Sequence, residues 1–163
     1  MIMNETSRLP TFKGIIDSTL REGLQFSRAD FSLAQMKEIF VSLSRIGIDF
    51  VEVGNPAQAE IRAMIAALVK ARRPGGPGIL SHIRNHPEDV ARAIEAGVDG
   101  VNILCTVDAE RLAGMGQSPE AYTDRLRRNI RTARARSLRV RVGVEDFFGQ
   151  PPQDRLDLHA TAV

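Results

Sequence analysis

Several polar side chains that can bind ligands lie close together in residues 17–26, namely Asp17, Arg21, Glu22 and Gln25. They follow a short apolar run at residues 14–16, which predicts a strand. A buried unpaired charge is costly, so charges at a strand end belong either to a satisfied ion pair or to a site. The planar guanidinium of Arg21 suits a carboxylate ligand, and the carboxylate of Glu22 suits a hard metal ion. The stretch therefore predicts a site, with a surface Arg–Glu pair as the alternative.

Strands and helices must position these groups, and the two alternate along the rest of the chain. Apolar runs predict strands at residues 15–16, 50–53, 78–82, 101–104 and 140–144, and helical spacing predicts helices at 32–46, 61–69, 87–96 and 118–136. Ser32 and Gln35 form a capping-box pattern. Residues 108–117 contain two glycines and are predicted to form a loop, and another helix is predicted from Leu156 onward. This alternation indicates βαβ units and a parallel sheet.

Each predicted strand delivers polar groups to its carboxyl end. The first strand is followed by Arg21, Glu22 and Gln25. The next four strands carry, in order, Glu52 and Asn55, then His82 and Arg84, then Asn102 and Thr106, and finally Arg141, Glu145 and Asp146. In a (β/α)8 barrel the chemistry lies where these strand ends meet, so we expect the groups to converge on one mouth. Structural interpretations remain open for some of them: Glu52 as the buried partner of an arginine, His82 as a satisfied strand-end histidine, His86 as a helix cap, and Glu145 with Asp146 as a cap.

Five motifs, in order, carry a resemblance to a known family. The first is Asp17-Ser-Thr-Leu-Arg-Glu-Gly23, and the others are Val51-Glu-Val-Gly-Asn-Pro56, Leu80-Ser-His-Ile-Arg-Asn-His86, Ala96-Gly-Val-Asp-Gly-Val101 and Val140-Arg-Val-Gly-Val-Glu-Asp146. Together they resemble the homocitrate synthase and isopropylmalate synthase family, from about residue 13 to 163. Members are metal-dependent barrel enzymes, related to hydroxymethylglutaryl-CoA lyases, that condense acetyl-CoA with a 2-oxo acid.

The resemblance implies a role for several residues. Arg21 would be the catalytic arginine that stabilises the developing oxyanion, and Glu22 would be a ligand of a divalent metal (Mg, Mn or Zn). Gln25 would line the substrate site, and His82 and Arg141 would bind carboxylates of the 2-oxo acid. Arg84, at the same strand end as His82, is a further candidate for substrate binding. Glu145 would belong to the catalytic polar network beneath the substrate.

Three features depart from the family pattern. Leu24 stands where an acidic residue is usual, and Gly143 stands where homocitrate synthases offer a serine hydroxyl. The family also completes its metal site with a His-x-His pair on a late strand. The three histidines of this chain, His82, His86 and His159, form no such pair. A single carboxylate holds a divalent cation poorly, because hard cations take about six ligands.

These observations predict a partial (β/α)8 TIM barrel, an α/β fold with parallel strands one to five, outer helices, a flexible arm at residues 1–12 and an incomplete catalytic domain at 13–163. The predicted function is the N-terminal part of a homocitrate or isopropylmalate synthase-like acyltransferase that is inactive alone. One alternative is an accessory subunit that forms a homo-oligomer or pairs with a chain carrying the histidine pair. Another is an open doubly wound sheet that binds a small carboxylate, which strand order would distinguish.

Composition narrows the remaining classes of function. Apolar residues make up 43% of the 163 residues and charged residues 26%, and no apolar run approaches membrane-spanning length. The net charge of +2 and the eight arginines of residues 125–141, which fall on the helix face opposite the apolar one, argue against nucleic-acid binding. The single Cys105 excludes an internal disulfide and a zinc pattern. Without a signal-peptide pattern, we expect a cytoplasmic protein.

Overall fold

A computed structural model describes residues 14–26 and 31–146 of the chain. Its strands are β1 (Ile16–Asp17), β2 (Phe50–Val53), β3 (Gly78–Arg84), β4 (Gly100–Cys105) and β5 (Arg139–Val144). Its helices are α1 (Thr19–Gln25), α2 (Leu33–Arg45), α3 (Ala59–Ala71), α4 (Pro87–Ala96), α5 (Ala109–Gly114) and α6 (Pro119–Ala135). The predicted arm at residues 1–12, the predicted helix after Leu156 and His159 lie outside the described residues.

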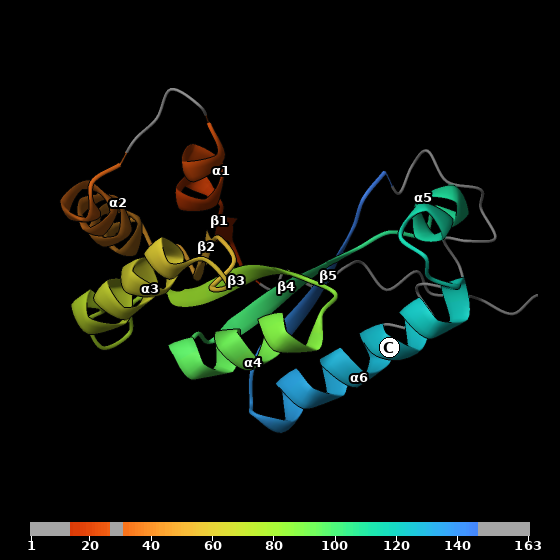
Figure 1. Cartoon of the computed structure of the whole chain (residues 1–163). Helices are drawn as coiled ribbons and strands as arrows, with labels where there is room; N and C mark the ends of the chain where they lie inside the picture. Colours follow the sequence, from red (N-terminus) through yellow and green to blue (C-terminus); the bar gives the residue numbers. More distant parts are fainter. Residues whose placement is uncertain (1–13, 27–30, 147–163) are drawn as a thin grey trace, which may run out of the picture.

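The five strands form one parallel sheet in the order β1-β2-β3-β4-β5. Helices α2, α3, α4 and α6 lie along one face of this sheet, as Figure 1 shows. A doubly wound sheet reverses its strand order, whereas a barrel keeps the strands in sequence. The structure is therefore a half-barrel, which confirms the predicted partial TIM barrel and excludes the doubly wound alternative.

The core fills the layer between the sheet and the outer helices. Alternate strand residues contribute to it, among them Val51, Ile79, Val101 and Ile103, all fully buried. Because side chains alternate along a strand, the intervening residues project to the other, concave face. The polar residues Glu52, His82 and Asn102 belong to this second set, which explains how polar groups gather on one side of an apolar sheet.

Local sequence signals set most of the helix boundaries. The Ser32 hydroxyl accepts a hydrogen bond from Gln35 N at 3.3 Å, and the Gln35 side chain bonds back to Ser32 N at 2.9 Å, as the capping box predicted. Helix α4 has Pro87 in its first turn and ends at Gly97, whose φ of 75° suits glycine. His86 occupies the N-cap position of α4 but makes no side-chain cap bond.

Two short helices were not predicted. The segment that follows β1 forms α1 rather than continuing the strand, so Arg21 and Glu22 lie on a helix. The predicted loop at 108–117 contains α5, because the Asp108 carboxylate caps it by accepting from Arg111 N at 3.0 Å. Both helices follow directly after the carboxyl ends of strands, where they can carry side chains toward the mouth of the half-barrel.

Candidate functional site

The carboxylate of Glu52 is the centre of a polar cluster at the carboxyl ends of the strands. Its side chain is 1% exposed. Oε2 accepts hydrogen bonds from Ser18 Oγ at 2.7 Å and from Arg21 Nε at 2.8 Å. Oε1 accepts from Asn102 Nδ2 at 2.7 Å and lies 3.3 Å from His82 Nδ1. One buried carboxylate thus joins the start of α1 with β2, β3 and β4.

Glu52 remains ionised in this environment. Burial opposes the charged form, but the contacts with His82, Ser18, Asn102 and Arg21 outweigh it and hold the pKa of Glu52 well below its ordinary value of 4.5. A fixed negative charge therefore lies beneath the mouth of the half-barrel. This charge neutralises Arg21, and it holds the histidine and the asparagine in position by accepting their hydrogen bonds.

Arg21 contacts two carboxylates, the buried one of Glu52 and the exposed one of Glu22. Its Nε bonds Glu52, while its Nη2 pairs with Glu22 Oε1. The side chain of Glu22 is 60% exposed, so it projects away from the cluster toward solvent. Thr19 N and Thr19 Oγ1 both donate to Asp17, at 2.9 and 3.1 Å, which holds the first turn of α1. The adjacent Arg–Glu pair is therefore a real ion pair, and its arginine is also anchored in the buried cluster.

Among the predicted site residues, the structure joins Arg21 and His82 through Glu52, whereas Glu22 contacts Arg21 at the exposed edge of the cluster. Arg141 is exposed, and its backbone is the register partner of Asn102, which places it beside the cluster on β5. Gln25 is exposed at the last position of α1. The roles predicted for these residues stay predictions, because contacts alone do not assign them.

Arg84 and Glu145 belong to separate ion pairs. Arg84 forms a bidentate pair with the buried Asp89 of α4, with both N–O distances at 2.9 Å. Burial opposes ionisation of Asp89, but hydrogen bonds from Arg84 and Asn55 lower its pKa. Glu145 pairs with Arg111 of α5 at 2.7 Å rather than with the Glu52 cluster. Within the described part of the chain neither residue is hydrogen-bonded or ion-paired to His82, so this geometry does not support their predicted substrate and catalytic roles.

The sequence did not identify three members of this cluster as site residues, namely Glu52, Asn102 and Ser18. Glu52 had an open structural interpretation as an arginine's partner, which its bond to Arg21 confirms. Asn102 was noted only as a strand-end residue, and Ser18 was not singled out. Their signal was position: Asn102 is the register partner of His82, and Glu52 is the register partner of Leu80, which precedes His82 on the same concave face of β3.

A divalent metal does not fit the described residues as a complete site. Within residues 14–26 and 31–146, no group of three His, Cys, Asp or Glu side chains is arranged to hold a metal ion. Glu22 offers one carboxylate, already paired with Arg21. His82 and Glu52 bond to each other, so their facing atoms are occupied. No step of the proposed condensation is therefore assigned to a metal.

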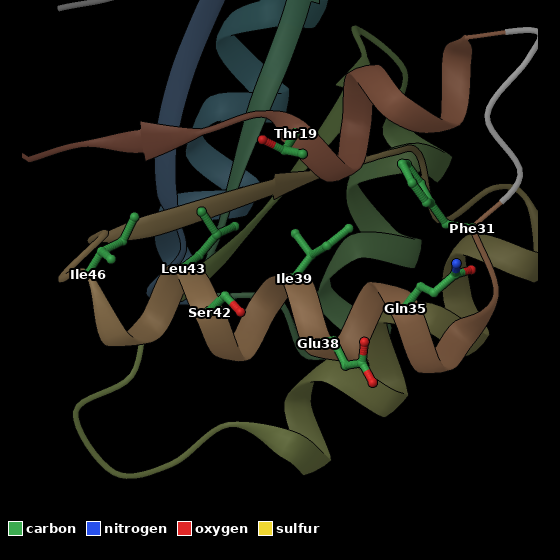
Figure 2. Close-up of a pocket in the computed structure, with 8 residues that line it drawn as sticks. All are labelled: Thr19, Phe31, Gln35, Glu38, Ile39, Ser42, Leu43 and Ile46. Atoms are coloured by element: carbon green, nitrogen blue, oxygen red, sulfur yellow. The ribbon is translucent and has the colours of Figure 1, made fainter.

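An apolar groove lies on the outer side of the half-barrel, between α1 and the exposed flank of α2. It has a volume of about 550 Å³, and its lining is drawn in Figure 2: Thr19, Phe31, Gln35, Glu38, Ile39, Ser42, Leu43 and Ile46. Ile46 is 73% exposed at the end of this groove. The groove lies apart from the Glu52 cluster, since it shares none of that cluster's residues.

The sheet order and the strand-end cluster define an α/β-barrel protein with its polar site at the carboxyl ends of the strands. The chain belongs to the HMGL-like family, whose model matches residues 13–163. This confirms the resemblance inferred from the motifs.

The similar curated proteins are homocitrate synthases. The chain is 33% identical over 148 residues to the mitochondrial homocitrate synthase of Penicillium rubens, covering 90% of this chain and 31% of that protein. It is 31% identical over 153 residues to the cytosolic isozyme of Saccharomyces cerevisiae, covering 90% and 34%. The homocitrate synthase of Pyrococcus horikoshii is 34% identical over 133 residues, covering 81% and 37%. The chain thus spans about a third of the length of these relatives and is homocitrate synthase-like.

Solved structures of HMG-CoA lyases share the fold. The Bacillus subtilis enzyme superposes with a TM-score of 0.74 at 17% identity, covering 91% of this chain and 54% of that one. The Acinetobacter baumannii enzyme, solved with coenzyme A and 3-methylmalate, gives a TM-score of 0.69 at 14% identity, covering 91% and 52%. These likenesses establish the half-barrel architecture alone. None of the described helices is long and apolar enough to cross a membrane.

Proposed function

We propose that this chain is the N-terminal part of the catalytic barrel of a homocitrate synthase-like acyltransferase, with residues 13–163 as that part of the barrel. The reaction is a condensation of acetyl-CoA with a 2-oxo acid. The observation that supports it best is the Glu52 cluster, which joins Arg21 and His82 at the carboxyl ends of the strands. The similarity to three homocitrate synthases supports the substrate class.

The residues of this chain contribute charge and position. Arg21 offers oriented guanidinium N–H donors at the strand ends, where an alkoxide would develop, because its bond to Glu52 fixes the direction of the guanidinium. We assign the carboxylates of a 2-oxo acid to Arg141 on β5 and His82 on β3, and the support for this is that both residues are register neighbours of Asn102. Glu22 is the residue of this chain proposed to contribute one ligand to a divalent metal, whose remaining ligands would have to lie outside the described residues.

Binding and turnover test this proposal separately. We expect 2-oxoglutarate to bind the chain weakly in an NMR titration, and substitution Arg141→Ala to weaken that binding about tenfold or more, since a charge-assisted hydrogen bond contributes roughly 1.5–3 kcal/mol. We expect no release of coenzyme A thiol from acetyl-CoA and 2-oxoglutarate by this chain alone. Equal binding by the variant would contradict the assigned role of Arg141, and thiol release would contradict the predicted inactivity.

A second candidate function is supported by the free edge of β1 and the groove beside α2. Among described residues, β1 pairs only with β2, and Ile15 is exposed next to it. In a closed barrel each outer helix packs between two neighbours. Here α2 packs against α3 on one flank, while half-buried Ile39 and Leu43 and exposed Ile46 line the groove. We propose a separate chain of β/α units as the occupant, one that adds a strand to β1 and an amphipathic helix to the groove.

The association state of the pure chain tests this second candidate. Exposed strand edges and apolar grooves promote self-association when their partner is absent. We expect concentration-dependent association in size-exclusion chromatography, reduced by Ile46→Lys. The matched control is Met115→Lys, since Met115 is exposed at the end of α5, away from the groove. A wild-type chain that stays monomeric contradicts this candidate, and a discrete dimer at low concentration indicates a second copy as the occupant instead.

A further inference from the structure

The imidazole of His82 is held from behind by a carboxylate. His82 Nδ1 lies 3.3 Å from Glu52 Oε1 and 3.2 Å from Asn102 Nδ2, while Asn102 Nδ2 lies 2.7 Å from the same Glu52 oxygen. Glu52 and Asn102 are buried, whereas the His82 side chain is 18% exposed. One edge of the ring therefore faces the buried cluster, and the opposite edge carries Nε2.

The cluster determines which ring nitrogen carries the proton when His82 is neutral. An ionised carboxylate accepts hydrogen bonds and cannot donate them. Asn102 must present its amide nitrogen to Glu52, because its oxygen there would place two acceptors 2.7 Å apart. His82 Nδ1 lies 3.3 Å from the same carboxylate oxygen, to which it can bond only as a donor, and its 3.2 Å approach to Asn102 Nδ2 is then a contact between two donors and not a hydrogen bond. The neutral ring thus has its proton on Nδ1 and a lone pair on Nε2.

The charged groups around His82 come from every neighbouring element. Glu52 of β2 supplies the negative charge in direct contact, and Asn102 of β4 is neutral. Arg21 of α1 is held against Glu52, and Arg141 of β5 is the register neighbour of Asn102. On β3 itself, Arg84 is already paired with Asp89. The two arginines attract an anion to the place that His82 faces.

We propose that His82 binds a ligand carboxylate only as the imidazolium, so that carboxylate binding at this site takes up a proton, with Glu52 as the positioning residue. The inference rests on the proposed function, in which the ligand is a 2-oxo acid. A lone pair on Nε2 repels a carboxylate oxygen, whereas an Nε2–H donates to it. The proton comes from solvent, and it joins Nε2 as the ligand binds. A carboxylate on each side of the ring then stabilises the imidazolium.

Two measurements on the full chain test the inference. The first is the tautomer of His82 in the free protein, read from long-range ¹⁵N–¹H NMR at high pH, where we expect Nδ1–H. The second is isothermal titration with 2-oxoglutarate between pH 6 and pH 8.5 in buffers of different ionisation enthalpy. We expect uptake of up to one proton per ligand, and a dissociation constant that rises by up to about tenfold per pH unit at the alkaline end.

Variants separate this coupling from a structural role. His82→Gln places a neutral amide donor near the position of Nε2 and is expected to bind 2-oxoglutarate without proton uptake. Glu52→Gln removes the charge behind the ring and is expected to shift the pH dependence of binding toward lower pH. The matched control is His86→Gln, because His86 is exposed at the N-cap of α4 and makes no side-chain cap bond. That control is expected to leave both the proton uptake and the pH dependence unchanged.

The outcomes distinguish the inference from the proposed function. An Nε2–H tautomer in the free protein, or binding without proton uptake at pH 8, overturns the inference even if 2-oxoglutarate binds. Glutarate, which lacks the keto group, is titrated in parallel. If glutarate and 2-oxoglutarate bind equally with proton uptake, the inference stands and the 2-oxo acid preference fails. If neither dicarboxylate binds at any pH, both are overturned.

Discussion

Asn102 Oδ1 is buried beside Gly143 and has no hydrogen-bond partner among the described residues. A Cβ built on Gly143 would lie 3.2 Å from this oxygen. The orientation that leaves Oδ1 unpaired is imposed by Glu52, which requires the amide nitrogen of Asn102 on its other side. The cluster thus satisfies its charge completely and leaves one neutral acceptor unsatisfied, at a cost of roughly 1–3 kcal/mol.

A hydroxyl at position 143 is expected to satisfy this acceptor. Gly143→Ser places a donor next to Asn102 Oδ1, and we expect a gain of about 0.5–1.5 kcal/mol in the free energy of unfolding by urea, after a small shift of the amide. Gly143→Ala is the control, because it adds the same Cβ, and the same loss of backbone freedom in the unfolded chain, without the donor. An alanine variant as stable as the serine variant would show that the hydroxyl makes no bond.

Glu52 is expected to make the stability of the chain depend on pH in the acidic range. Its folded pKa lies below the ordinary value of 4.5, so the unfolded state binds more protons as the pH falls below about 4.5. Its contribution to stability is therefore complete above that pH and is lost progressively below it. Urea unfolding at pH 7, 5 and 3.5 should show a weaker acid dependence for Glu52→Gln than for the wild type.

At neutral pH the same substitution is expected to destabilise the chain by about 3 kcal/mol, because Arg21 loses its buried partner. The control is Glu60→Gln, which changes an exposed carboxylate in the first turn of α3. This control should leave the stability at pH 7 within about 0.5 kcal/mol of the wild type. Parallel pH profiles for the wild type and Glu52→Gln would contradict the assignment of the acid-labile charge to Glu52.

Much of the fold could be predicted because its signals are local. Alternating apolar runs gave the five strands, and capping residues such as Ser32 and Ser118 gave helix starts that the structure has. The helices α1 and α5 were missed because each is only two turns or less, too short for a periodic apolar face. Asp108 was the available signal for α5, as an N-cap residue followed by helix formers.

The site was predicted less completely because its contacts are long-range. The motif at residues 17–23 identified Arg21 and Glu22, but Glu52, the buried partner of Arg21, lies 31 residues from it in the sequence. Pairing of that kind depends on strand register, which a single sequence does not specify. Arg84 illustrates the converse, since its strand-end position suggested substrate binding, whereas the nearby Asp89 of α4 accepts hydrogen bonds from its Nε and Nη2.

Cys105 is expected to be unreactive in the folded chain. Burial, together with the nearby charge of Glu145, raises the pKa of its thiol to about 12, and the thiolate is the reactive form. Ellman's reagent at pH 8 should therefore label the native chain slowly and the chain in urea fast. The raised pKa also predicts that stability falls as the pH rises above about 9, because the unfolded thiol then ionises while the folded thiol does not. Rapid labelling of the native chain would contradict burial of the thiol.

Divalent metal is expected to have little effect on the stability of this chain by itself. Glu22 is exposed and paired with Arg21, and the described residues hold no group of three metal-ligating side chains. A ligand present at its dissociation constant adds only about 0.4 kcal/mol of stability, which corresponds to a shift of roughly 1 °C in Tm. We therefore expect 5 mM Mg²⁺ or Mn²⁺, or an excess of EDTA, to shift the Tm of the wild type and of Glu22→Gln by no more than about 1 °C. An EDTA-sensitive Tm that Glu22→Gln abolishes would instead show a metal held tightly by this carboxylate, with ligands beyond those in the described residues.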